Sequence, residues 1–326
     1  MITILGFGLA GAWCARHLIS AGERVRVIDP WESTTSTRIA AGIIVPIAGQ
    51  RCKPTWRIRE LLPIARTAYP SAVWRDVEIV RAFRSDEQRE EFYRQGAKGA
   101  YVGIDVVEFQ PDSMLGLQAP YGGFISQDAA VVDLPEFLND TRKLVEERGE
   151  FVVGRFDAHS EAPLTTTIYA MGWHIHNHPL WSWLKLEPSK GETIDVESPD
   201  DLGSRVVSNG TWIVSAHGRQ RVGATNVWWD LDPTPTDSAQ QRLLDDYESL
   251  TGRRPRVIGH HAAIRPSTQF KRPMVGQHPE RPNAWICTGF GAKGTLFGPW
   301  AARELVQSIL NGHRIDHDID IAHLRI

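Results

Sequence analysis

The sequence predicts an α/β fold with a Rossmann-like dinucleotide-binding domain and a second domain. Three observations support this prediction. The chain opens with a strand, a glycine-rich turn, a helix and a second strand that ends in an acid. A second glycine-rich turn precedes a helical segment near the end of the chain, and the stretch 188–225 alternates in a strand-like manner. A chain of 326 residues is long enough for two domains, or for one domain interrupted by another.

The opening segment carries a dinucleotide-binding fingerprint. The β-branched run Ile2–Leu5 leads into the turn Gly6–Gly11 (GFGLAG), and helical spacing follows. Gly6 allows the tight turn, Gly8 lets a pyrophosphate approach the backbone, and Gly11 lets the helix pack closely on the strand. This complete pattern predicts dinucleotide binding, and the alternative is an α/β start that binds no nucleotide.

The fingerprint continues through the helix into the next strand. The helix N-terminus, at Leu9 and Ala10, presents free N–H groups and a positive dipole end to a phosphate. The second strand, Arg24–Ile28, is followed by Asp29, whose carboxylate can accept both hydroxyls of an adenosine ribose. A 2′-phosphate would meet this carboxylate, so Asp29 argues against NADP. The choice between FAD and NAD depends on other segments.

Composition excludes several partner classes. The 36 basic and 39 acidic side chains give a net charge of −3, which is too even to indicate a nucleic-acid or anionic-membrane partner. Cys14, Cys52 and Cys287 form no CxxC pair, which fits a reducing compartment. We expect no signal peptide and no membrane span, because a strand begins at residue 2 and no apolar run is long enough. A cytoplasmic protein is therefore expected.

The loop after Asp29 carries the first family resemblance. A polar stretch, WESTTSTR, runs into small and apolar residues, and the string STRIAAGIIVPI behind such a fingerprint resembles the D-amino acid oxidase superfamily of FAD enzymes. The resemblance implies an FAD-binding domain of the GR2 type, in which this loop crosses the pyrophosphate and the flavin ring. The alternative is a buried strand after a turn. The residues that the resemblance assigns to the cofactor here are Arg38, Ala40, Ala41, Gly42 and Ile43.

The middle of the chain reads as helix, strands and helix. Residues 55–99 carry helical spacing with many charges, typical of a solvated helix face. Strands are expected at Tyr101–Pro111 and Tyr121–Ile125, and an amphipathic helix at Leu134–Arg148. The string GGFISQDAAVVDLPEFL again resembles the family, at the return from the substrate domain. A strand then covers Phe151–Phe156, and Phe156 matches the family position that contacts the adenine side through its backbone.

A strand of the buried type is expected at Thr165–Met171. The turn that follows it resembles the family's turn beside FAD, and this resemblance assigns Gly172 to the cofactor. His174, His176 and His178 follow. On a strand, alternate histidines would share one face and could bind a transition metal. No acidic or cysteine cluster accompanies them, and the family uses no metal, so a surface loop is expected and no metal site is predicted.

The segment from Pro188 to Thr225 contains three strand-like runs and resembles the family's antiparallel substrate sheet. A helix is expected at Thr236–Thr251, with a stop near Gly252. The second domain is therefore expected to be α+β, built on an antiparallel sheet. We assign residues 1–73, 129–175 and 277–326 to the FAD-binding domain, and residues 74–128 and 176–276 to the substrate domain.

The segment His260–Gly276 carries the predicted substrate anchor. Arg265, followed by proline, matches the family's arginine that holds the substrate carboxylate. A guanidinium is always charged and forks onto a carboxylate with two parallel hydrogen bonds, so it fixes the α-carbon. A structural salt bridge is the alternative. Gln269 stands where the family often has an aspartate. Some members attach the flavin to a cysteine soon after this arginine, but Cys287 lies inside the next strand, so non-covalent FAD is expected.

The last glycine-rich turn, 289–294, follows an expected strand at Ala284–Thr288 and precedes a helix to about Leu310. No further strand and acid follow, so a second nucleotide site is not expected. The turn resembles the family's C-terminal segment, where the helix N-terminus points at the flavin pyrimidine and stabilises negative charge there. The residues assigned to the cofactor by this resemblance are Gly291, Ala292, Lys293, Gly294 and Thr295.

The resemblance implies FAD-dependent oxidation of a carboxylate-bearing amine, an amino acid or an N-substituted glycine. A hydride would pass from the α-carbon to flavin N5, the imine would hydrolyse, and oxygen or another acceptor would take the electrons. Three alternatives stay open: a tRNA-modifying oxidoreductase that resembles the wobble-uridine enzyme, a non-catalytic FAD-binding redox sensor, and an NAD dehydrogenase. The oligomeric state and the substrate side chain are not predicted.

Overall fold

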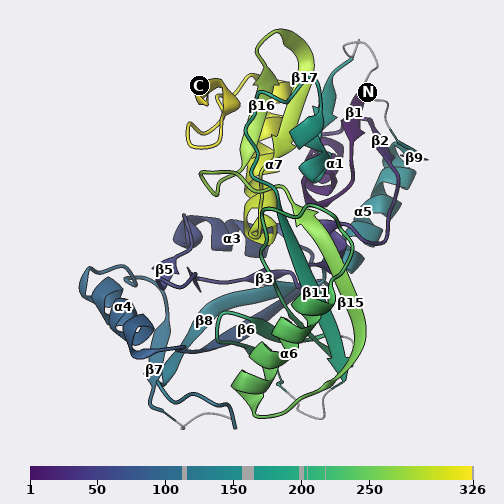
Figure 1. The fold of residues 1–326 in the computed structure, drawn as a ribbon. Coiled ribbons are helices and arrows are strands. Elements are labelled where there is room, and N and C mark those ends of the chain that lie inside the picture. The colour runs from purple at the N-terminus through teal and green to yellow at the C-terminus, as the bar shows by residue number, and fades with distance from the viewer. Residues whose placement is uncertain (112–115, 156–164, 198–201, 204, 217, 325–326) are drawn as a thin grey trace.

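The computed structural model describes residues 1–111, 116–155, 165–197, 202–203, 205–216 and 218–324. Two large sheets organise this part of the chain. Figure 1 shows the first sheet, with β1, β2 and β9, in the upper part of the molecule, and β6 and β8 of the second sheet in the lower part. None of the helices in these described ranges combines the length and the apolar character needed to cross a bilayer.

The first sheet has the order β16-β17-β10-β1-β2-β9. Every neighbouring pair in it is parallel except β16 with β17. The sheet packs against α1 and α7, and α1 also contacts α5. This arrangement confirms the Rossmann-like domain. Its elements are β1 (Ile2–Leu5), α1 (Leu9–Ser20), β2 (Val25–Asp29), α5 (Leu134–Arg148), β9 (Glu150–Val153), β10 (Thr167–Tyr169), β16 (Met274–His278), β17 (Arg281–Thr288) and α7 (Gly294–Asn311).

The second sheet has the order β15-β11-β14-β13-β12-β6-β8-β3, with β7 also paired to β8. All its pairs are antiparallel except β12 with β6. This confirms the second, mainly antiparallel α+β unit. Its elements are β3 (Ile43–Ile44), β6 (Trp74–Ala82), β7 (Val106–Phe109), β8 (Gly123–Val132), β11 (Ser189–Glu197), β12 (Arg205–Ser208), β13 (Trp212–Ala216), β14 (Arg219–Gly223), α6 (Asp237–Thr251) and β15 (Arg256–Arg265).

The other elements connect strands or lie beside the sheets. Helix α2 precedes β3, and the hairpin of β4 and β5 leads into α3. Helix α4 follows β6, and the 3-10 helices η1 and η2 lie beside the first sheet. The bounds of these connecting elements are α2 (Ser36–Ile39), β4 (Ile47–Ala48), β5 (Lys53–Pro54), α3 (Ile58–Ala68), α4 (Asp86–Ala97), η1 (Gly172–Asn177) and η2 (Ile321–His323).

Two predicted helices lie where they were expected. Helix α5 has the predicted bounds, and α6 begins one residue later than predicted, at Asp237. Helix α5 begins after Asp133, whose side chain accepts a hydrogen bond from the N–H of Glu136 and so satisfies a helix-end donor. Helix α6 begins after Thr236, which caps the N–H of Ala239, and it ends at Gly252 in the left-handed conformation with φ 70°. Polar caps and a terminal glycine are local signals, so sequence alone locates these ends.

Two other predictions need correction. Residues 55–99 were expected to be helical throughout, but β6 runs between α3 and α4 in the centre of that range. Charged residues interrupt the apolar alternation of β6, so its strand period is weak in the sequence. Strand β8 continues to Val132, beyond the predicted end at Ile125, because its second half pairs with β3 and β6.

The domain division remains a proposal. We propose an FAD-binding domain at 1–73, 129–175 and 277–326 and a substrate domain at 74–128 and 176–276. Strand β8 spans the proposed boundary between residues 128 and 129, and β3 belongs to the second sheet. The proposed boundary thus divides a strand of the second sheet, and the cavity described next takes its walls from both sheets.

Candidate active site

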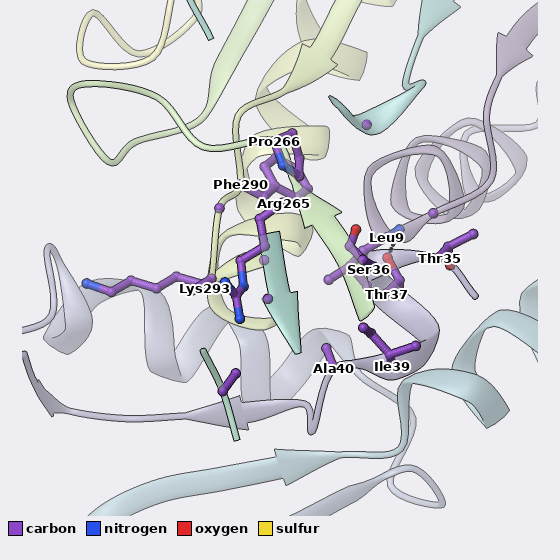
Figure 2. Close-up of a pocket in the computed structure, with 18 of the residues that line it drawn as sticks. Leu9, Thr35, Ser36, Thr37, Ile39, Ala40, Arg265, Pro266, Phe290 and Lys293 are labelled. Carbon is purple, nitrogen blue, oxygen red and sulfur yellow. Dashed lines mark hydrogen bonds between the residues drawn. The ribbon is translucent and has the colours of Figure 1, made fainter. Parts of the chain in front are cut away.

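A cavity of about 1050 Å³ is lined by residues from both sheets and from the loops between them. Figure 2 shows Leu9, Ser36 and Thr37 on one side of this cavity and Arg265, Pro266 and Phe290 on the other. A cavity of this size, with an apolar lining and a few convergent polar groups, is typical of a cofactor-and-substrate site. The residues described below therefore form the candidate active site.

The fingerprint turn has the close approaches that its glycines predict. Gly6 has φ +92°, and a Cβ there would lie 2.5 Å from the carbonyl oxygen of Ala170. A Cβ on Gly11 would lie 2.0 Å from the carbonyl oxygen of Gly6, so only glycine lets α1 pack this closely on the turn. The cavity is lined by Gly6, Gly8, Leu9 and Ala10. Gly11 does not line it, and its role is to let α1 pack against the turn.

Asp29 lies at the end of β2 and lines the cavity. Its Oδ2 accepts a hydrogen bond of 2.6 Å from the N–H of Phe7, and its Oδ1 accepts one of 2.6 Å from the N–H of Trp31. Each carboxylate oxygen has two lone pairs, so both oxygens retain acceptor capacity for a ribose hydroxyl. The two backbone bonds fix the orientation of the carboxylate relative to the glycine turn.

Thr37 is a site residue that the sequence reasoning did not single out. Its hydroxyl accepts a hydrogen bond of 3.1 Å from the N–H of Leu9, the first residue of α1. A Cβ on Gly8 would come within 3.3 Å of the same hydroxyl oxygen. Thr37 therefore caps the helix end that faces the cavity. The polar string WESTTSTR was a signal for such a role, but composition alone does not show which hydroxyl reaches the helix.

Arg38, by contrast, does not line the cavity within the described residues. Its guanidinium lies over the ring of Trp31, at 4.0 Å from the ring centroid. Burial lowers the pKa of Arg38, while the charge of Asp29 raises it. Its Nη2 is buried without a hydrogen-bond partner. The side chain thus lies beside Trp31 and within the electrostatic influence of Asp29, and its contact with a phosphate stays a prediction.

The loop after α2 passes along the cavity. Ala40, Ala41, Gly42 and Ile43 line the cavity. Gly42 has φ +67°, and a Cβ there would lie 2.0 Å from the carbonyl oxygen of Val132, so the loop packs directly on the end of β8. This close contact requires glycine at position 42.

A buried ion pair of the second sheet holds the same loop. Arg221 on β14 donates a hydrogen bond of 3.2 Å to the carbonyl oxygen of Ile39. It also donates to both oxygens of Asp195, at 2.7 and 3.1 Å. Burial raises the pKa of Asp195, but hydrogen bonds from His261 and Arg221 and the charges of Arg221 and Arg219 outweigh burial and hold this pKa well below its usual range. The ion pair thereby connects the second sheet to the loop that lines the cavity.

Gly172 lies at the start of η1 and lines the cavity with φ +60°. A Cβ there would meet no protein atom within 4 Å, so this position faces open space. The premise that the following histidines alternate along a strand is wrong, since His174 and His176 lie in η1, and His178 follows it and is buried. In the described part of the chain, no cluster of histidine, cysteine or acidic side chains has the geometry of a metal site.

The second glycine-rich turn leads into the N-terminus of α7. Gly289 and Gly291 have φ +80° and +52°, and the helix begins at Gly294 without a side-chain cap. Residues Gly291, Ala292, Lys293, Gly294 and Thr295 line the cavity. An uncapped helix N-terminus presents N–H groups and a positive dipole end to a ligand. Burial lowers the pKa of Lys293, and the charge of Lys271 adds to this effect.

Arg265 ends β15 and lines the cavity. Its Nη1 donates to the carbonyl oxygen of Thr225 at 3.1 Å and to Oδ1 of Asn226 at 3.4 Å. Burial lowers its pKa to about 10, so the guanidinium is charged at neutral pH. Among the described residues, no carboxylate lies within ion-pairing distance of Arg265. The predicted anchor thus has neutral partners and an unneutralised charge.

The predicted site residues divide into three groups. Gly11 and Arg38 lie behind the cavity wall, and Phe156 lies outside the described residues. The cavity brings together Gly6, Gly8, Leu9, Ala10, Asp29, Ala40, Ala41, Gly42, Ile43, Gly172, Arg265, Gly291, Ala292, Lys293, Gly294 and Thr295.

These residues fit a dinucleotide cofactor. The tight turn at Gly6, the open space at Gly172 and the uncapped N-terminus of α7 supply contacts for backbone-bound phosphate and for a planar ring. Cys287 is buried on β17 and is among the residues that line the cavity, so the absence of a covalent bond to the flavin stays a prediction. The fold and the cavity are those of a dinucleotide-binding protein, and anion binding at Arg265 stays a prediction.

The family follows from comparison with known proteins. The model of the family described as FAD dependent oxidoreductase matches residues 1–308, and the chain belongs to this family. The cofactor is therefore FAD. The glycine oxidase of Pseudomonas aeruginosa is 23% identical over 350 aligned positions, which cover 95% of this chain and 94% of that protein.

Solved structures agree on the fold. The glycine oxidase of Bacillus cereus superposes with a TM-score of 0.79 at 18% identity, covering 97% of this chain and 96% of that one. The iminodiacetate oxidase of Chelativorans sp. superposes with a TM-score of 0.78 at 19% identity, with the same coverage of both chains. These similarities confirm the fold, in which the two sheets are arranged as in those two structures.

A bifunctional tRNA-modifying protein is also similar. The tRNA 5-methylaminomethyl-2-thiouridine biosynthesis protein of Marinobacter nauticus is 24% identical over 353 aligned positions. These positions cover 94% of this chain but 55% of that protein. The chain thus matches part of a longer relative, and the wobble-uridine resemblance is kept as an alternative.

Proposed function

We propose that this protein catalyses the FAD-dependent oxidation of a carboxylate-bearing amine, an amino acid or an N-substituted glycine. The observation that carries the proposal is the environment of Arg265. A desolvated guanidinium that faces a cavity, with no carboxylate partner in the described residues, is a receptor for an anion from outside the protein. A substrate carboxylate supplies that anion and completes the ion pair.

The geometry of Arg265 also supports a positioning role. Thr225 and Asn226 hold one edge of the guanidinium through Nη1. Two parallel hydrogen bonds from a guanidinium fix both the distance and the plane of a carboxylate. Because the α-carbon is bonded to that carboxylate, Arg265 fixes the α-carbon as well, and this reduces the entropic cost of reaching the reactive geometry.

Other residues of the chain hold and polarise the cofactor region. The turn at Gly6 and Gly8, with Asp29, is proposed to bind the adenosine and pyrophosphate part. The loop Ala40–Ile43 and Gly172 are proposed to line the ring. Bound FAD supplies the acceptor for the two electrons and the α-hydrogen of the amine. The N-terminus of α7 favours negative charge beside it. The imine product then hydrolyses in water, and oxygen or another acceptor takes the electrons.

The test is anaerobic mixing of the FAD-loaded protein with glycine, sarcosine, iminodiacetate, N-(5-carboxypentyl)glycine and a panel of D-amino acids. We expect bleaching of the flavin absorbance by at least one of them. If none bleaches it, the amine-oxidase proposal is wrong.

A matched pair of variants isolates the anchor. Arg265→Met is expected to weaken substrate binding by about 100-fold, because it removes a charge-assisted, bidentate contact worth about 3 kcal/mol. Arg265→Lys keeps the charge but loses the fork, so we expect an intermediate effect. Both variants should keep the flavin spectrum of the parent. If Arg265→Met binds the substrate with wild-type affinity, Arg265 is not the carboxylate anchor.

The alternatives make different predictions. A tRNA-modifying enzyme should bind tRNA with an affinity that falls steeply with salt. A non-catalytic redox sensor should be insensitive to loss of Arg265. The near-even charge balance favours the small-molecule amine over the tRNA.

A further inference from the structure

A second arginine lines the same cavity. Arg81 lies on β6, and its side chain is 6% exposed. Val77, Ile79 and Arg81 alternate along β6 and so share one face of the sheet. Ile79 and Arg81 both line the cavity.

The strand pairing shows how far Arg81 lies from Arg265 across the second sheet. Arg81 is paired with Ser208, and Ser208 with Trp212. Trp212 is paired with Gly223, and Gly223 with Thr193. Four strand spacings of about 4.8 Å therefore separate the backbones of Arg81 and Thr193 before sheet curvature is considered.

The guanidinium of Arg265 lies at the other end of this row. It covers Gly191, which lies two positions before Thr193 on β11, since a Cβ on Gly191 would come within 2.0 Å of Arg265 Nη2. The two arginines thus approach the cavity from opposite ends of one row of strands.

Arg81 has few partners for a buried cation. Its Nη2 donates a hydrogen bond of 2.7 Å to the carbonyl oxygen of Gly49, and its Nε is buried without a partner. The ring of Phe124 lies 5.9 Å from its guanidinium carbon. Burial lowers the pKa of Arg81. Within the described residues, no carboxylate forms an ion pair with it.

Two other arginines around the second sheet are neutralised by acids. Arg84, which also lines the cavity, pairs with Asp246 at 3.3 Å. Arg221 pairs with Asp195 at 2.7 Å. The described carboxylates that line the cavity are Asp29 and Glu32, and both belong to the nucleotide end. Arg81 therefore keeps an unneutralised charge at the end of the cavity remote from the nucleotide.

A structural role does not account for this arrangement. One bond to the Gly49 carbonyl uses one of the five N–H donors of the guanidinium. A buried charge without a counter-ion is costly, and a neutral side chain could tie down one carbonyl without that cost. An anion that enters the cavity removes the penalty, because it can accept from Nε and from the remaining donors.

We propose that Arg81 binds a second carboxylate, so that the substrate is an amine whose α-carboxylate is held by Arg265 and whose far carboxylate is held by Arg81. This inference rests on the proposed function. The far carboxylate stands at the end of a chain of several methylenes, because four strand spacings lie between the two ends of the row. The intervening floor suits methylenes, since Ile79, Val206 and Trp212 line it. The substrate class is therefore ω-carboxyalkyl amino acids or N-(ω-carboxyalkyl)glycines.

The test compares acids with their amides. Wild-type FAD-loaded protein is mixed anaerobically with D-2-aminoadipate and N-(5-carboxypentyl)glycine, and with the same compounds carrying an amide in place of the far carboxylate. For the compound pair that reduces the flavin faster, we expect kcat/KM to be at least tenfold higher for the acid than for its amide. In Arg81→Met this acid-to-amide ratio should fall towards one, and Arg81→Lys should retain part of it.

Arg84→Met is the matched control, because Arg84 lines the same end of the cavity but already has Asp246 as a partner. It should keep the wild-type acid-to-amide ratio. A wild-type ratio near one for both pairs overturns the inference, even where glycine or another monocarboxylate bleaches the flavin and the proposed function stands. An unchanged ratio in Arg81→Met overturns it as well.

A binding measurement separates the inference from catalysis. Suberate carries two carboxylates and no amine, whereas octanoate has the same chain and one carboxylate. Suberate should raise the Tm of the wild-type holoprotein more than octanoate does at equal concentration. The difference should be lost in Arg81→Met, compared as a shift from that variant's own Tm. Equal shifts in the wild type contradict a second carboxylate site, whatever the protein oxidises.

Discussion

The guanidinium of Arg265 occupies the space that a side chain on residue 191 would take. A Cβ built on Gly191 would lie 2.0 Å from Arg265 Nη2 and 2.2 Å from its Cζ. Gly191 is on β11, which pairs with β15, the strand that ends in Arg265. The missing side chain at position 191 therefore leaves the room in which the proposed anchor lies flat against the sheet.

Gly191→Ala is expected to displace the guanidinium and to raise KM for the amine at least tenfold, because a misplaced fork loses a bidentate contact. Flavin content should stay near that of the parent. The measurement is the concentration dependence of anaerobic flavin reduction. Gly96→Ala is the control, since a Cβ at Gly96 would make ordinary contacts of 3.6 Å with Tyr101 in another part of the molecule. An unchanged KM in Gly191→Ala would show that the Arg265 guanidinium can bind the substrate without the space left by Gly191.

The fold was predictable because its decisive signals are local. Gly11 and Asp29 are required by contacts within one strand-turn-helix-strand unit, and the caps of α5 and α6 lie beside the helices that they start. All the residues of such a unit lie close together in the sequence, so the unit can be predicted without knowledge of the rest of the fold. The weak alternation in β6 shows the limit, because that strand is defined by its neighbours β8 and β12 rather than by its own period.

The site was predictable only in part, for a related reason. Arg265 and the turn at 289–294 were found through motifs. Thr37, Arg81 and Gly191 were not found, because their roles depend on contacts with Leu9, Gly49 and Arg265, which are distant in the chain. Nothing in the residues near Arg81 indicates that its charge has no counter-ion. That property belongs to the folded cavity.

Thr37 offers a test of the helix cap. Thr37→Val is expected to lower the free energy of unfolding by about 1 kcal/mol, because the N–H of Leu9 loses its partner. Thr37→Ser keeps the hydroxyl and is expected to remain within about 0.5 kcal/mol of the parent. Chemical denaturation of the apoprotein measures both values. If Thr37→Val and Thr37→Ser unfold at the same denaturant concentration, the hydrogen bond does not stabilise the turn.

The buried pair of Asp195 and Arg221 predicts a pH-dependent stability difference. The folded-state pKa of Asp195 is held below its unfolded value, so this carboxylate stabilises the fold fully above about pH 4 and loses that effect as the pH falls further. Asp195→Asn should therefore be less stable than the parent at pH 7, and the difference should shrink below about pH 4. Urea denaturation at pH 7, 5 and 3 measures it.

Asp76→Asn is the matched control for that experiment. Asp76 also pairs with an arginine, Arg66, at 3.0 Å, but both side chains are about half exposed. Exposed pairs contribute at most about 1 kcal/mol, so the loss of Asp76 should be small at every pH. A difference for Asp195→Asn that stays constant from pH 7 to pH 3 would mean that its effect does not come from the ionised carboxylate.

Gly172 and Gly22 allow cofactor contact to be separated from backbone strain. Gly172 has φ +60° and Gly22 has φ +84°, and a Cβ at either position would meet no protein atom within 4 Å. Alanine at each position should cost about 1–2 kcal/mol of stability, because L residues are disfavoured in the left-handed region. Gly172 lines the cavity, whereas Gly22 follows α1 outside it. If Gly172 faces the flavin, Gly172→Ala should raise the Kd for FAD at least tenfold while Gly22→Ala leaves it near the parent value. Fluorescence titration of the apoproteins with FAD measures both constants, and equal constants for the two variants would place the flavin away from residue 172.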